Sequence, residues 1–452
     1  MRSEHQLSSG PLKLQEGSRI GIIGGGPAGS FFSYFLLDLA KRIGLDLRID
    51  IYEPRNFFFP SPMGCNMCGG IISESLVQNL ATEGLNLPPE IVQRGIESYT
   101  LHTHEGSVTI GTPLQEKRIA AVHRGCGPKD VKDTKWGSFD GFLQVLVLEK
   151  GANLIQSKVE NIQFQNGLPA IIQTNKKTKS YDLVVVAVGI NSNLLNKFPD
   201  LSTGYKPPKK TKTLIREFYL GEETIAKTLG NSMHVFLMDI PGLEFAAIIP
   251  KGDYVTLCML GRDLGKELLA KFLNSPDVIR VMPEVLLRKI ESCQCSPSIN
   301  IRGAHRPYSD RLVFIGDAGV TRLYKDGIGA AYRTAKAAAN TVIFEGISTE
   351  DFHKYYWPVC RKINRDNLIG QMVFIANKLN QKIGLTRSTI LRMVREEQEL
   401  NHSNKYMSLI LWDMFTGSSP YLNIFLIGIS PAFLLRFIKS FFLELTLVFR
   451  KN

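Results

Sequence analysis

The sequence predicts an α/β fold, in which a parallel sheet is accompanied by a smaller antiparallel sheet and a helical C-terminal region. Three observations support this. A buried strand, Ser18–Ile23, a helical run, Ser30–Arg42, and an alternating strand, Leu47–Tyr52, form a β-α-β unit. Alternating apolar segments then follow in the middle of the chain. Beyond about residue 350 the pattern is typical of helices to the end.

Further elements complete the parallel-sheet region. Asn56–Gly70 is rich in Phe, Pro, Gly and Cys and is expected to be a loop. Phe139–Lys150 has the apolar spacing of a helix, and Tyr181–Gly189 is typical of a strand buried on both faces. Leu312–Ile315 predicts another strand, and Gly327 opens a long alanine-rich helix.

The middle of the chain is expected to form the smaller sheet. Tyr205–Arg216 is basic and contains two prolines, which predicts irregular structure, with Lys206–Lys212 as a solvated turn. The segments His234–Met238, Glu244–Ile249 and Tyr254–Leu260 alternate apolar and polar residues. They predict an antiparallel sheet of the kind that carries a substrate over a cofactor held elsewhere.

The elements divide the chain into regions, and 452 residues with 44% hydrophobic content suffice for a large buried core. The expected regions are an N-terminal tail (1–17), a nucleotide-binding domain (18–204, completed by 300–345), an antiparallel domain (205–299), a helical region (346–420) and an apolar, basic tail (421–452).

Charge and composition bound the class of protein. The formal net charge of +12 describes a basic surface that can attract an anionic cofactor or an anionic membrane. No helix-turn-helix, zinc-finger or RNP signature occurs, so we expect no nucleic-acid binding. The N-terminus lacks a signal-peptide pattern, which predicts a cytoplasmic protein. In that reducing compartment the seven cysteines of the chain are expected to be thiols.

The end of the chain is unusually apolar. Tyr421–Leu435 is almost wholly apolar but shorter than the ~20 residues of a spanning helix, and Pro431 interrupts it. This pattern predicts one or two helices lying in a membrane interface, so that the protein is peripherally membrane-associated. A packed helix pair or a dimer contact is the alternative. The apolar residues that follow alternate with or precede Arg436, Lys439, Arg450 and Lys451.

A glycine pattern, G-x-G-x-x-G, joins the first strand to the first helix. Gly24 allows the tight turn, Gly26 lets the backbone approach a pyrophosphate, and Gly29 lets the helix pack closely on the sheet. The helix start, with Pro27 and Ala28, offers free N–H groups and a positive dipole end to that anion. The pattern predicts a dinucleotide site of Rossmann type.

An acidic residue supports the same site. Glu53 ends the second strand, 24 residues beyond Gly29, where its carboxylate can accept hydrogen bonds from an adenosine ribose. A carboxylate there favours FAD or NAD over NADP, whose 2′-phosphate it would repel. We also expect Pro54, Arg55 and Gly189 to lie at the cofactor.

A second motif selects FAD. The strand at Leu312 runs into Gly316-Asp317, where the Asp can hold a ribityl hydroxyl. Ten residues on, Gly327-Ile328-Gly329 starts a helix whose N–H groups can face the flavin pyrimidine edge and stabilise the reduced ring. Taken alone, Asp317 is as readily a turn or cap residue. The two motifs together predict bound FAD.

With these motifs, the sequence resembles the geranylgeranyl reductase family, within the p-hydroxybenzoate-hydroxylase-like flavoproteins, over about residues 18–370. The glycine turns and their acidic residues match the family's two FAD motifs. The Phe139-Asp140-x-x-Leu143 helix matches a third, and Arg124 sits where an arginine often approaches FAD, although a longer insert separates it from Phe139.

Two narrower features also resemble this family. Cys68-Gly69-Gly70 resembles a Cys-Gly-Gly loop beside the flavin, which makes Cys68 a catalytic candidate and places Gly69 and Gly70 at the cofactor. Pro250-Lys251-Gly252-Asp253 resembles a segment of the substrate sheet. The residues before it lack the usual aromatic pair, and the loop after Asp317 lacks the usual proline, which leaves the substrate open.

The resemblance implies an FAD-dependent reductase that saturates carbon-carbon double bonds of an isoprenoid or prenyl lipid by hydride transfer. The electron donor is open between NAD(P)H and a ferredoxin-like protein, since no second dinucleotide motif occurs. Three alternatives stay open. They are a flavin monooxygenase that hydroxylates or epoxidises an apolar substrate, a non-redox cyclase or isomerase, and a membrane-docked electron carrier to quinone.

The cysteines and histidines carry weaker signals. Cys65 and Cys68 have the spacing of a redox pair, and with Cys293 and Cys295 they could make a four-thiolate site, but that spacing is irregular and we expect no metal. Cys126, Cys258 and Cys360 are expected to be packing residues. The same holds for the histidines of the probable strands, which are His102, His104 and His123.

Overall fold

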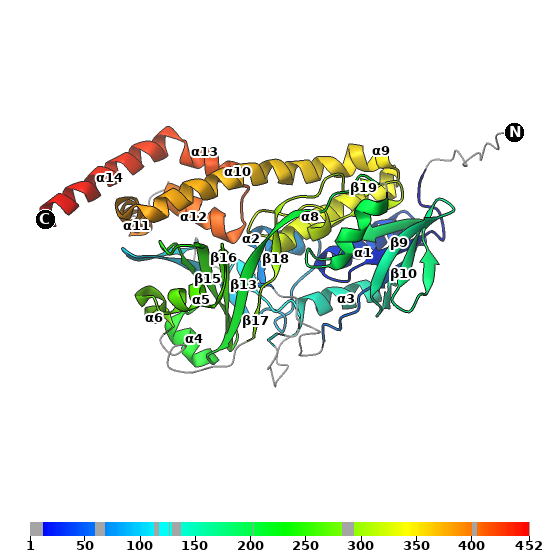
Figure 1. Cartoon of the computed structure of the whole chain (residues 1–452), viewed down its shortest axis with the longest axis horizontal. Helices are drawn as coiled ribbons and strands as arrows, with labels where there is room; N and C mark the ends of the chain where they lie inside the picture. Colours follow the sequence, from blue (N-terminus) through cyan, green and yellow to red (C-terminus); the bar gives the residue numbers. More distant parts are fainter. Residues whose placement is uncertain are drawn as a thin grey trace.

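The computed structural model describes residues 12–58, 68–112, 117–125, 127–128, 137–201, 203–282, 293–399 and 405–451. Two sheet regions lie side by side, and a long helix, α10, runs across both (Figure 1). The α/β fold expected from the sequence, with a parallel nucleotide-type sheet, an antiparallel sheet and C-terminal helices, is confirmed. The division into the five expected regions stays a prediction.

The parallel sheet has the strand order β19-β20-β12-β1-β2-β8. All neighbours in it are parallel except β19 and β20. The chain passes from β1 through α1 to β2, the connection predicted by the glycine pattern. The strands are β1 (Arg19–Ile23), β2 (Arg48–Tyr52), β8 (Asn153–Ile155), β12 (Leu183–Val186), β19 (Tyr308–Ser309) and β20 (Leu312–Phe314).

Helices α1 (Pro27–Arg42), α3 (Phe139–Glu149) and α8 (Gly327–Asn340) pack together on this sheet. Their apolar faces share one core with the buried strand residues, because each helix places aromatic or aliphatic residues every three to four positions. Tyr332 of α8 contacts Phe31 and Phe35 of α1 edge to face. This packing holds the starts of α1 and α8 at one end of the sheet.

Two small sheets accompany the parallel one. One is β11-β10-β9, an antiparallel meander, and the other is β3-β7-β4. Helix α2 (Glu74–Thr82) follows β3. The strands are β3 (Ile71–Ile72), β4 (Arg94–Ile96), β7 (Ile119–Ala121), β9 (Val159–Gln165), β10 (Leu168–Gln173) and β11 (Thr178–Ser180).

The larger sheet has the order β17-β13-β16-β15-β14-β5-β6, with β18 also paired to β13. Its neighbours are antiparallel except β14 and β5. The three alternating segments of the sequence are its β14, β15 and β16. The strands are β5 (Ser98–Thr103), β6 (Gly106–Gly111), β13 (Lys209–Tyr219), β14 (Ser232–Phe236), β15 (Leu243–Lys251), β16 (Tyr254–Gly261), β17 (Gln294–Cys295) and β18 (Ser298–Arg302).

One expectation about this sheet is wrong. The basic segment Tyr205–Arg216 was expected to be irregular, with Lys206–Lys212 as a turn, but most of it belongs to strand β13. Pro207 and Pro208 precede the first paired residue, so neither removes a ladder hydrogen bond. The lysines of β13 lie on its exposed half, while Leu214 and Phe218 are buried. The exposed lysines at its start hide the strand character of the segment.

Helices form the C-terminal part of the described chain, as predicted. They pack on the larger sheet through an apolar cluster in which Phe374 stacks on Phe245. The helices are α9 (Thr349–Asp351), α10 (Trp357–Lys382), α11 (Gly384–Glu399), α12 (Tyr406–Thr416), α13 (Tyr421–Gly428) and α14 (Pro431–Lys451). On the opposite side lie α4 (Glu222–Thr228), α5 (Lys266–Leu273) and α6 (Pro276–Val281).

By length and composition, no single helix of the described residues qualifies as a membrane span. One bent pair, Tyr421–Gly428 with Pro431–Arg450, does pass the test jointly, with a bend of 61°.

Candidate functional site

The two glycine turns meet at the carboxyl ends of β1 and β20. A side chain at Gly29 would place its Cβ 1.9 Å from the Gly24 carbonyl oxygen, so α1 approaches the turn at a distance that only glycine permits. Gly316 has φ +57°, and a Cβ there would lie 2.7 Å from the Ala28 Cβ. The Gly316-Asp317 turn therefore touches the first turn of α1, as a single dinucleotide site requires.

Glu53 lies at the end of β2 and faces the first glycine turn. Its Oε2 accepts a hydrogen bond from the Gly25 N–H at 3.0 Å, and its Oε1 accepts two from Arg55, from the backbone N–H at 3.1 Å and from Nε at 3.2 Å. The carboxylate is thereby fixed beside the turn. Pro54 is exposed next to it. Gly189, in the loop after β12, is exposed and has open space where a Cβ would stand.

Arg124 and Asp140 form a bidentate ion pair between the glycine turn and α3. Arg124 Nε donates to Asp140 Oδ1 at 3.1 Å, and Nη2 donates to Oδ2 at 2.9 Å. Burial raises the pKa of Asp140, against the opposing pull of Arg124. Burial alone would lower the pKa of the Arg124 guanidinium, but Asp140, Cys68 and Asp317 together raise it. Arg124 Nη2 lies 3.5 Å from the Cβ position of Gly26, which places the cation where a phosphate can approach.

The segment from Asp317 to Gly327 and the neighbouring Asn300 contain buried polar atoms without a partner among the described residues. Burial raises the pKa of Asp317. Asn300 Nδ2 donates to the Asp317 carbonyl at 3.0 Å. Among the described residues, Asn300 Oδ1 and Thr321 Oγ1 are buried without a hydrogen-bond partner. Because such atoms are costly to leave unpaired, they indicate a polar ligand in this segment.

Helix α8 begins at Gly327, as predicted, and presents its N-terminus to the same region. Its cap residue, Asp326, adopts φ +52° and makes no side-chain hydrogen bond to the first turn. A Cβ at Gly329 would lie 2.1 Å from Asp326 Oδ1, so the Asp326 carboxylate packs against the first turn at a distance that only glycine permits. Ile328 is buried between the two glycines. The first N–H groups of α8 are thus available to an acceptor.

The Cys-Gly-Gly loop lies between this region and the larger sheet. Gly70 has φ +67° and accepts the Val122 N–H at 2.8 Å. A Cβ at Gly70 would stand 2.7 Å from Lys251 Nζ, and one at Gly69 would stand 3.0 Å from Cys258 Sγ. Cys68 therefore begins a loop whose two glycines rest directly on β15 and β16. Cys65, the proposed redox partner, lies outside the described residues, as does Cys126.

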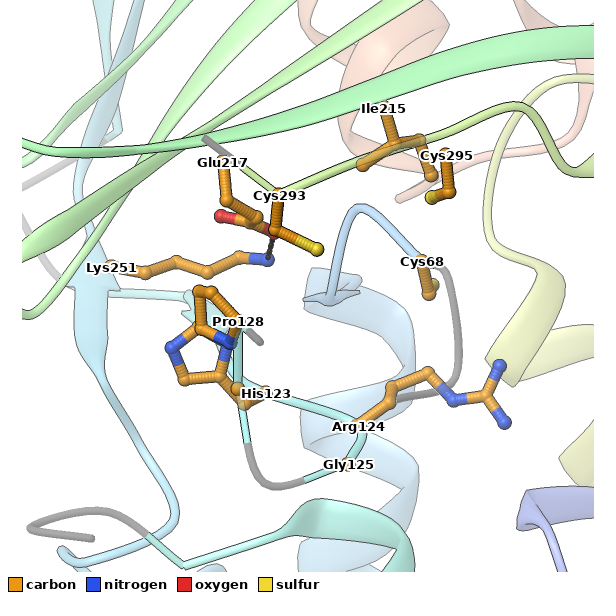
Figure 2. Close-up of a pocket in the computed structure, with 11 residues that line it drawn as sticks. Cys68, His123, Arg124, Gly125, Pro128, Ile215, Glu217, Lys251, Cys293 and Cys295 are labelled. Carbon is orange, nitrogen blue, oxygen red and sulfur yellow. Dashed lines mark ion pairs between the residues drawn. The ribbon is translucent and has the colours of Figure 1, made fainter. Parts of the chain in front are cut away.

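A pocket opens between the Cys-Gly-Gly loop and the sheet (Figure 2). Lys251 is 1% exposed, and its ammonium reaches to 3.9 Å from Glu217 Oε1. Thr256 Oγ1 donates to Glu217 at 2.8 Å. Arg124 and Cys68 line the same pocket. A buried cation and a buried carboxylate therefore lie next to the loop that the sequence places at the flavin.

Two neighbours of Lys251 are electrically neutral at physiological pH. Burial, followed by the charge of Lys251, lowers the pKa of His123 to about 3. Burial raises the pKa of Cys258 to about 12, against a smaller opposing effect of Lys251. Burial also raises the pKa of Glu217, which Lys251 and Thr256 only partly offset. On its sheet side, the pocket thus places the cation of Lys251 among groups that burial drives toward their neutral forms.

Among the described residues, Cys68, Cys258, Cys293, Cys295 and Cys360 form no disulfide. Cys293 and Cys295 line the pocket with Cys68. Cys360 is buried in the core that the parallel sheet shares with α1, α3 and α8. In the described part of the chain, no group of three or more His, Cys, Asp or Glu side chains has metal-binding geometry. Cys258 packs against the apolar cluster of the larger sheet, as expected, and also lies beside Gly69 of the Cys-Gly-Gly loop.

His102 and His234 are satisfied core residues, whereas His104 is exposed beyond β5 with its Nδ1 3.6 Å from Asp277 Oδ2. His102 Nε2 and His234 Nδ1 are 2.9 Å apart, and His234 Nε2 lies 3.3 Å from the Leu229 carbonyl. This agrees with the expectation for His102. His123, by contrast, lines the pocket. Sequence reasoning assigned no role to Lys251, Glu217 or His123, and only the Pro250-Lys251-Gly252-Asp253 segment signalled this region.

Comparisons with known proteins identify the fold. No protein-family model matches the chain, and no curated protein matches it in sequence. A geranylgeranyl bacteriochlorophyll reductase-like protein from Thermoplasma acidophilum superposes with TM-score 0.62 at 16% identity, over 91% of this chain and 98% of that one. Halogenase PltM, solved with phloroglucinol and FAD, gives 0.58 at 12% identity, over 96% and 93%.

A third solved structure is 2-methyl-3-hydroxypyridine-5-carboxylic acid oxygenase, with TM-score 0.54 at 15% identity, over 82% of this chain and 94% of that one. The chain therefore has the complete fold that these reductase-like, halogenase and oxygenase proteins share.

Proposed function

We propose that the protein is an FAD-dependent reductase that saturates carbon-carbon double bonds of an isoprenoid lipid. One observation carries the proposal. The two glycine turns meet in one place, and the Cys-Gly-Gly loop extends from there onto a sheet that holds a buried ammonium group. The shared fold with a reductase-like protein supports it.

The residues present fit FAD. Glu53 would accept the adenosine ribose hydroxyls, the N–H groups of Ala28 and Gly29 would face the pyrophosphate, and Asp317 would hold the ribityl chain. Asn300 Oδ1 and Thr321 Oγ1 would gain the partners that they lack within the described protein. When bound, FAD supplies hydride-transfer chemistry. Arg124 would add positive charge beside it.

Lys251 is suited to supply the proton. Saturating an alkene takes a hydride on one carbon and a proton on its neighbour, and Lys251 Nζ holds a proton in the same pocket as Cys68. After it gives the proton up, the neutral amine recovers one from solvent through Glu217, which faces it across the pocket. His123 is neutral there and leaves the cation of Lys251 as the acidic group.

The apolar substrate class rests on the resemblance. The apolar side chains of β15, such as Ile249 and Phe245, are packed against Tyr324 and the C-terminal helices. The two-electron donor belongs to one of two classes, NAD(P)H or a ferredoxin-like protein.

An anaerobic turnover experiment tests the function. The holoprotein is reduced chemically and mixed with a geranylgeranylated lipid, and the product is analysed by mass spectrometry. We expect a gain of two hydrogens for each reduced double bond, together with return of the oxidised flavin spectrum. Unchanged lipid and a flavin that stays reduced would contradict the proposal. Repeating the assay with NAD(P)H or reduced ferredoxin as the electron source identifies the donor.

A flavin monooxygenase is the second candidate, because an oxygenase and a halogenase share the fold. It predicts joint consumption of NAD(P)H and oxygen and a product that contains oxygen. An oxygen electrode with mass analysis of the lipid separates the two functions.

A further inference from the structure

Helix α10 carries an apolar stripe on its outer side. Its inward face is buried through Ile363, Asn367 and Phe374. The intervals between the exposed apolar residues are four, three and four positions, the spacing of one helix face. These side chains are open to solvent, and Ile375 among them is 63% exposed. The exposed stripe consists of Leu368, Met372, Ile375 and Leu379.

Helix α13 packs against α10 and repeats this arrangement. Tyr421 and Ile424 are buried, and the Tyr421 hydroxyl donates to the Leu323 carbonyl. Leu422, Leu426 and Ile429 point outward. The helix contains no charged residue. Its outer surface therefore extends the α10 stripe.

Helix α14 has two distinct faces. Phe433 and Ser440 are buried, and Glu444 forms an ion pair with Arg392 of α11, so this side holds the helix on the protein. The opposite side is apolar and open to solvent, and Leu435 and Phe449 on it are 70% and 74% exposed. Between them lie Ile438 and Phe442, at the three- and four-residue spacing of one face.

We call the outward apolar residues of α10, α13 and α14 the docking face. The three helices lie on the same side of the molecule, with α14 extending beyond α11 at the C-terminus (Figure 1). Most of the large apolar side chains that are exposed in the described part of the chain lie between Leu368 and Phe449. A continuous exposed apolar area of this kind marks an interaction surface.

We propose that the docking face binds an anionic lipid membrane and lies in its interface. Charge supports this occupant. Besides Glu444, which is paired, the charged residues of α14 are all basic, and they adjoin the apolar ones. An apolar face flanked by lysine and arginine is the pattern of interfacial helices on acidic lipids. The basic residues are Arg436, Lys439, Arg450 and Lys451.

A second copy of the chain fits the docking face less well. In a twofold contact each surface meets itself, so the positive α14 of one copy would face the positive α14 of the other. Their like charges would repel across a desolvated interface, whereas acidic headgroups would neutralise them.

The docking face is joined to the candidate flavin site by direct contacts. Arg322 donates to the carbonyls of Gly417 and Ser419, in the turn between α12 and α13, and it pairs with Asp326 at the start of α8. Lys325 donates to the Asp413 and Ser419 carbonyls. Membrane contact would therefore place the site at a fixed position over the bilayer. The value of this placement for catalysis rests on the proposed function, whereas lipid binding by the docking face does not.

Vesicle flotation of the full-length holoprotein tests the proposal. We expect the protein to float with vesicles of phosphatidylcholine and phosphatidylglycerol, and more weakly with phosphatidylcholine alone. The variant Leu435→Ser/Phe442→Ser/Phe449→Ser should lose flotation, and so should Leu368→Ser/Ile375→Ser to a smaller extent. A matched control, Tyr219→Ser/Phe344→Ser, removes exposed aromatics elsewhere and should float like the parent.

Charge and oligomeric state complete the test. Lys439→Gln/Arg450→Gln should weaken binding to acidic vesicles about fivefold for each charge removed and leave binding to neutral vesicles unchanged. Equal flotation of the triple variant and the parent would overturn the proposal. So would a dimer, seen by sedimentation, that the same triple variant dissociates, because it would assign the docking face to a second copy. Retained turnover of detergent-solubilised lipid by the triple variant would separate docking from catalysis.

Discussion

Two parts of this molecule build their polar sites in different ways. We call them the expected nucleotide side, which is the parallel sheet with α1, and the expected substrate side, which is the larger sheet with the Lys251 pocket. On the nucleotide side, Gly24, Gly29 and Glu53 lie within one β-α-β unit, and the geometry of its backbone forms most of the site. On the substrate side, Lys251, Glu217 and His123 come from separate segments and meet only in the folded sheet. The first site is a local motif, and the second is a product of strand pairing.

The difference also concerns energy. A glycine turn needs only the absence of a side chain, whereas a buried Lys–Glu pair needs both partners and the hydrogen bonds that satisfy them. The nucleotide side should therefore lose its ability to hold FAD when a side-chain atom is added at a glycine. The substrate side should lose activity when one of its charged groups is removed.

The largest effect should come from the substrate side. We expect Lys251→Met to slow saturation of the lipid about 10²- to 10⁴-fold, because no other cation would remain at that position to give the proton. FAD should stay bound, since Lys251 lies outside the glycine turns. The rate is read as single-turnover reoxidation of the reduced flavin by lipid, under anaerobic conditions.

Two further variants control this result. Lys227→Met removes an exposed lysine of α4 and should leave the rate unchanged. Adding Glu217→Gln to Lys251→Met removes the unpaired carboxyl and should restore thermal stability but not the rate. A Lys251→Met protein with the parent's rate would end the role of Lys251 as the proton source.

The nucleotide side should break on adding one methyl group. We expect Gly29→Ala to destabilise the protein by about 1–3 kcal/mol and to abolish FAD retention, because its Cβ would lie 1.9 Å from the Gly24 carbonyl oxygen. Gly111→Ala, where a Cβ meets nothing within 4 Å, is the matched control. Thermal unfolding and flavin content measure both. Normal flavin content in Gly29→Ala would refute the close approach of α1 to the turn.

Acid should weaken the substrate side first. Burial lowers the pKa of His102 to about 3 and that of His234 to about 4, both below the ordinary value of 6.5. The unfolded chain therefore binds protons that the folded chain does not, and stability is full above pH 6.5 and falls as the pH drops toward 4. Each histidine contributes a slope of about 1.4 kcal/mol per pH unit.

Chemical denaturation at a series of pH values measures this slope. The variant His102→Gln/His234→Gln should show a shallower loss between pH 6.5 and 5 than the parent. Identical slopes for the two proteins would show that this histidine pair does not control acid sensitivity.

The smallest effect concerns the unsatisfied atoms near the candidate ribityl site. We expect Thr321→Val to leave the FAD-free protein as stable or slightly more stable, because it removes a buried hydroxyl without a described partner. The same change should weaken FAD binding about tenfold, the value of one hydrogen bond. Fluorescence titration of the FAD-free protein measures the affinity. Unchanged affinity would place the cofactor away from Thr321.

The sequence was informative where structure is local. The β-α-β unit, the start of α8 at Gly327 and the strands β14 to β16 follow from periodicity and glycine spacing, because neighbours in sequence decide them. Strand β13 was missed because its exposed lysines and the two prolines just before it are typical of a loop, whereas its pairing with β16 and β18 depends on distant segments. Arg124 was expected at the cofactor. Its bidentate pairing with Asp140 was not predicted, because Asp140 lies on α3, a separate element.

The substrate-side pocket could not be predicted for a related reason. Glu217 pairs in register with Thr256, and Lys251 reaches Glu217 across β16, so their proximity depends on the order β13-β16-β15. Nothing in the spacing of these residues along the chain fixes that order.

The central claim is that the two distant glycine-acid turns hold one flavin nucleotide, and the flavin content of the purified protein tests it most directly. The account predicts a yellow protein that releases FAD on denaturation at one molecule per chain, and less in a variant with Asp317→Ala. A folded protein that is colourless, and that takes up no FAD when it is added, would contradict the account.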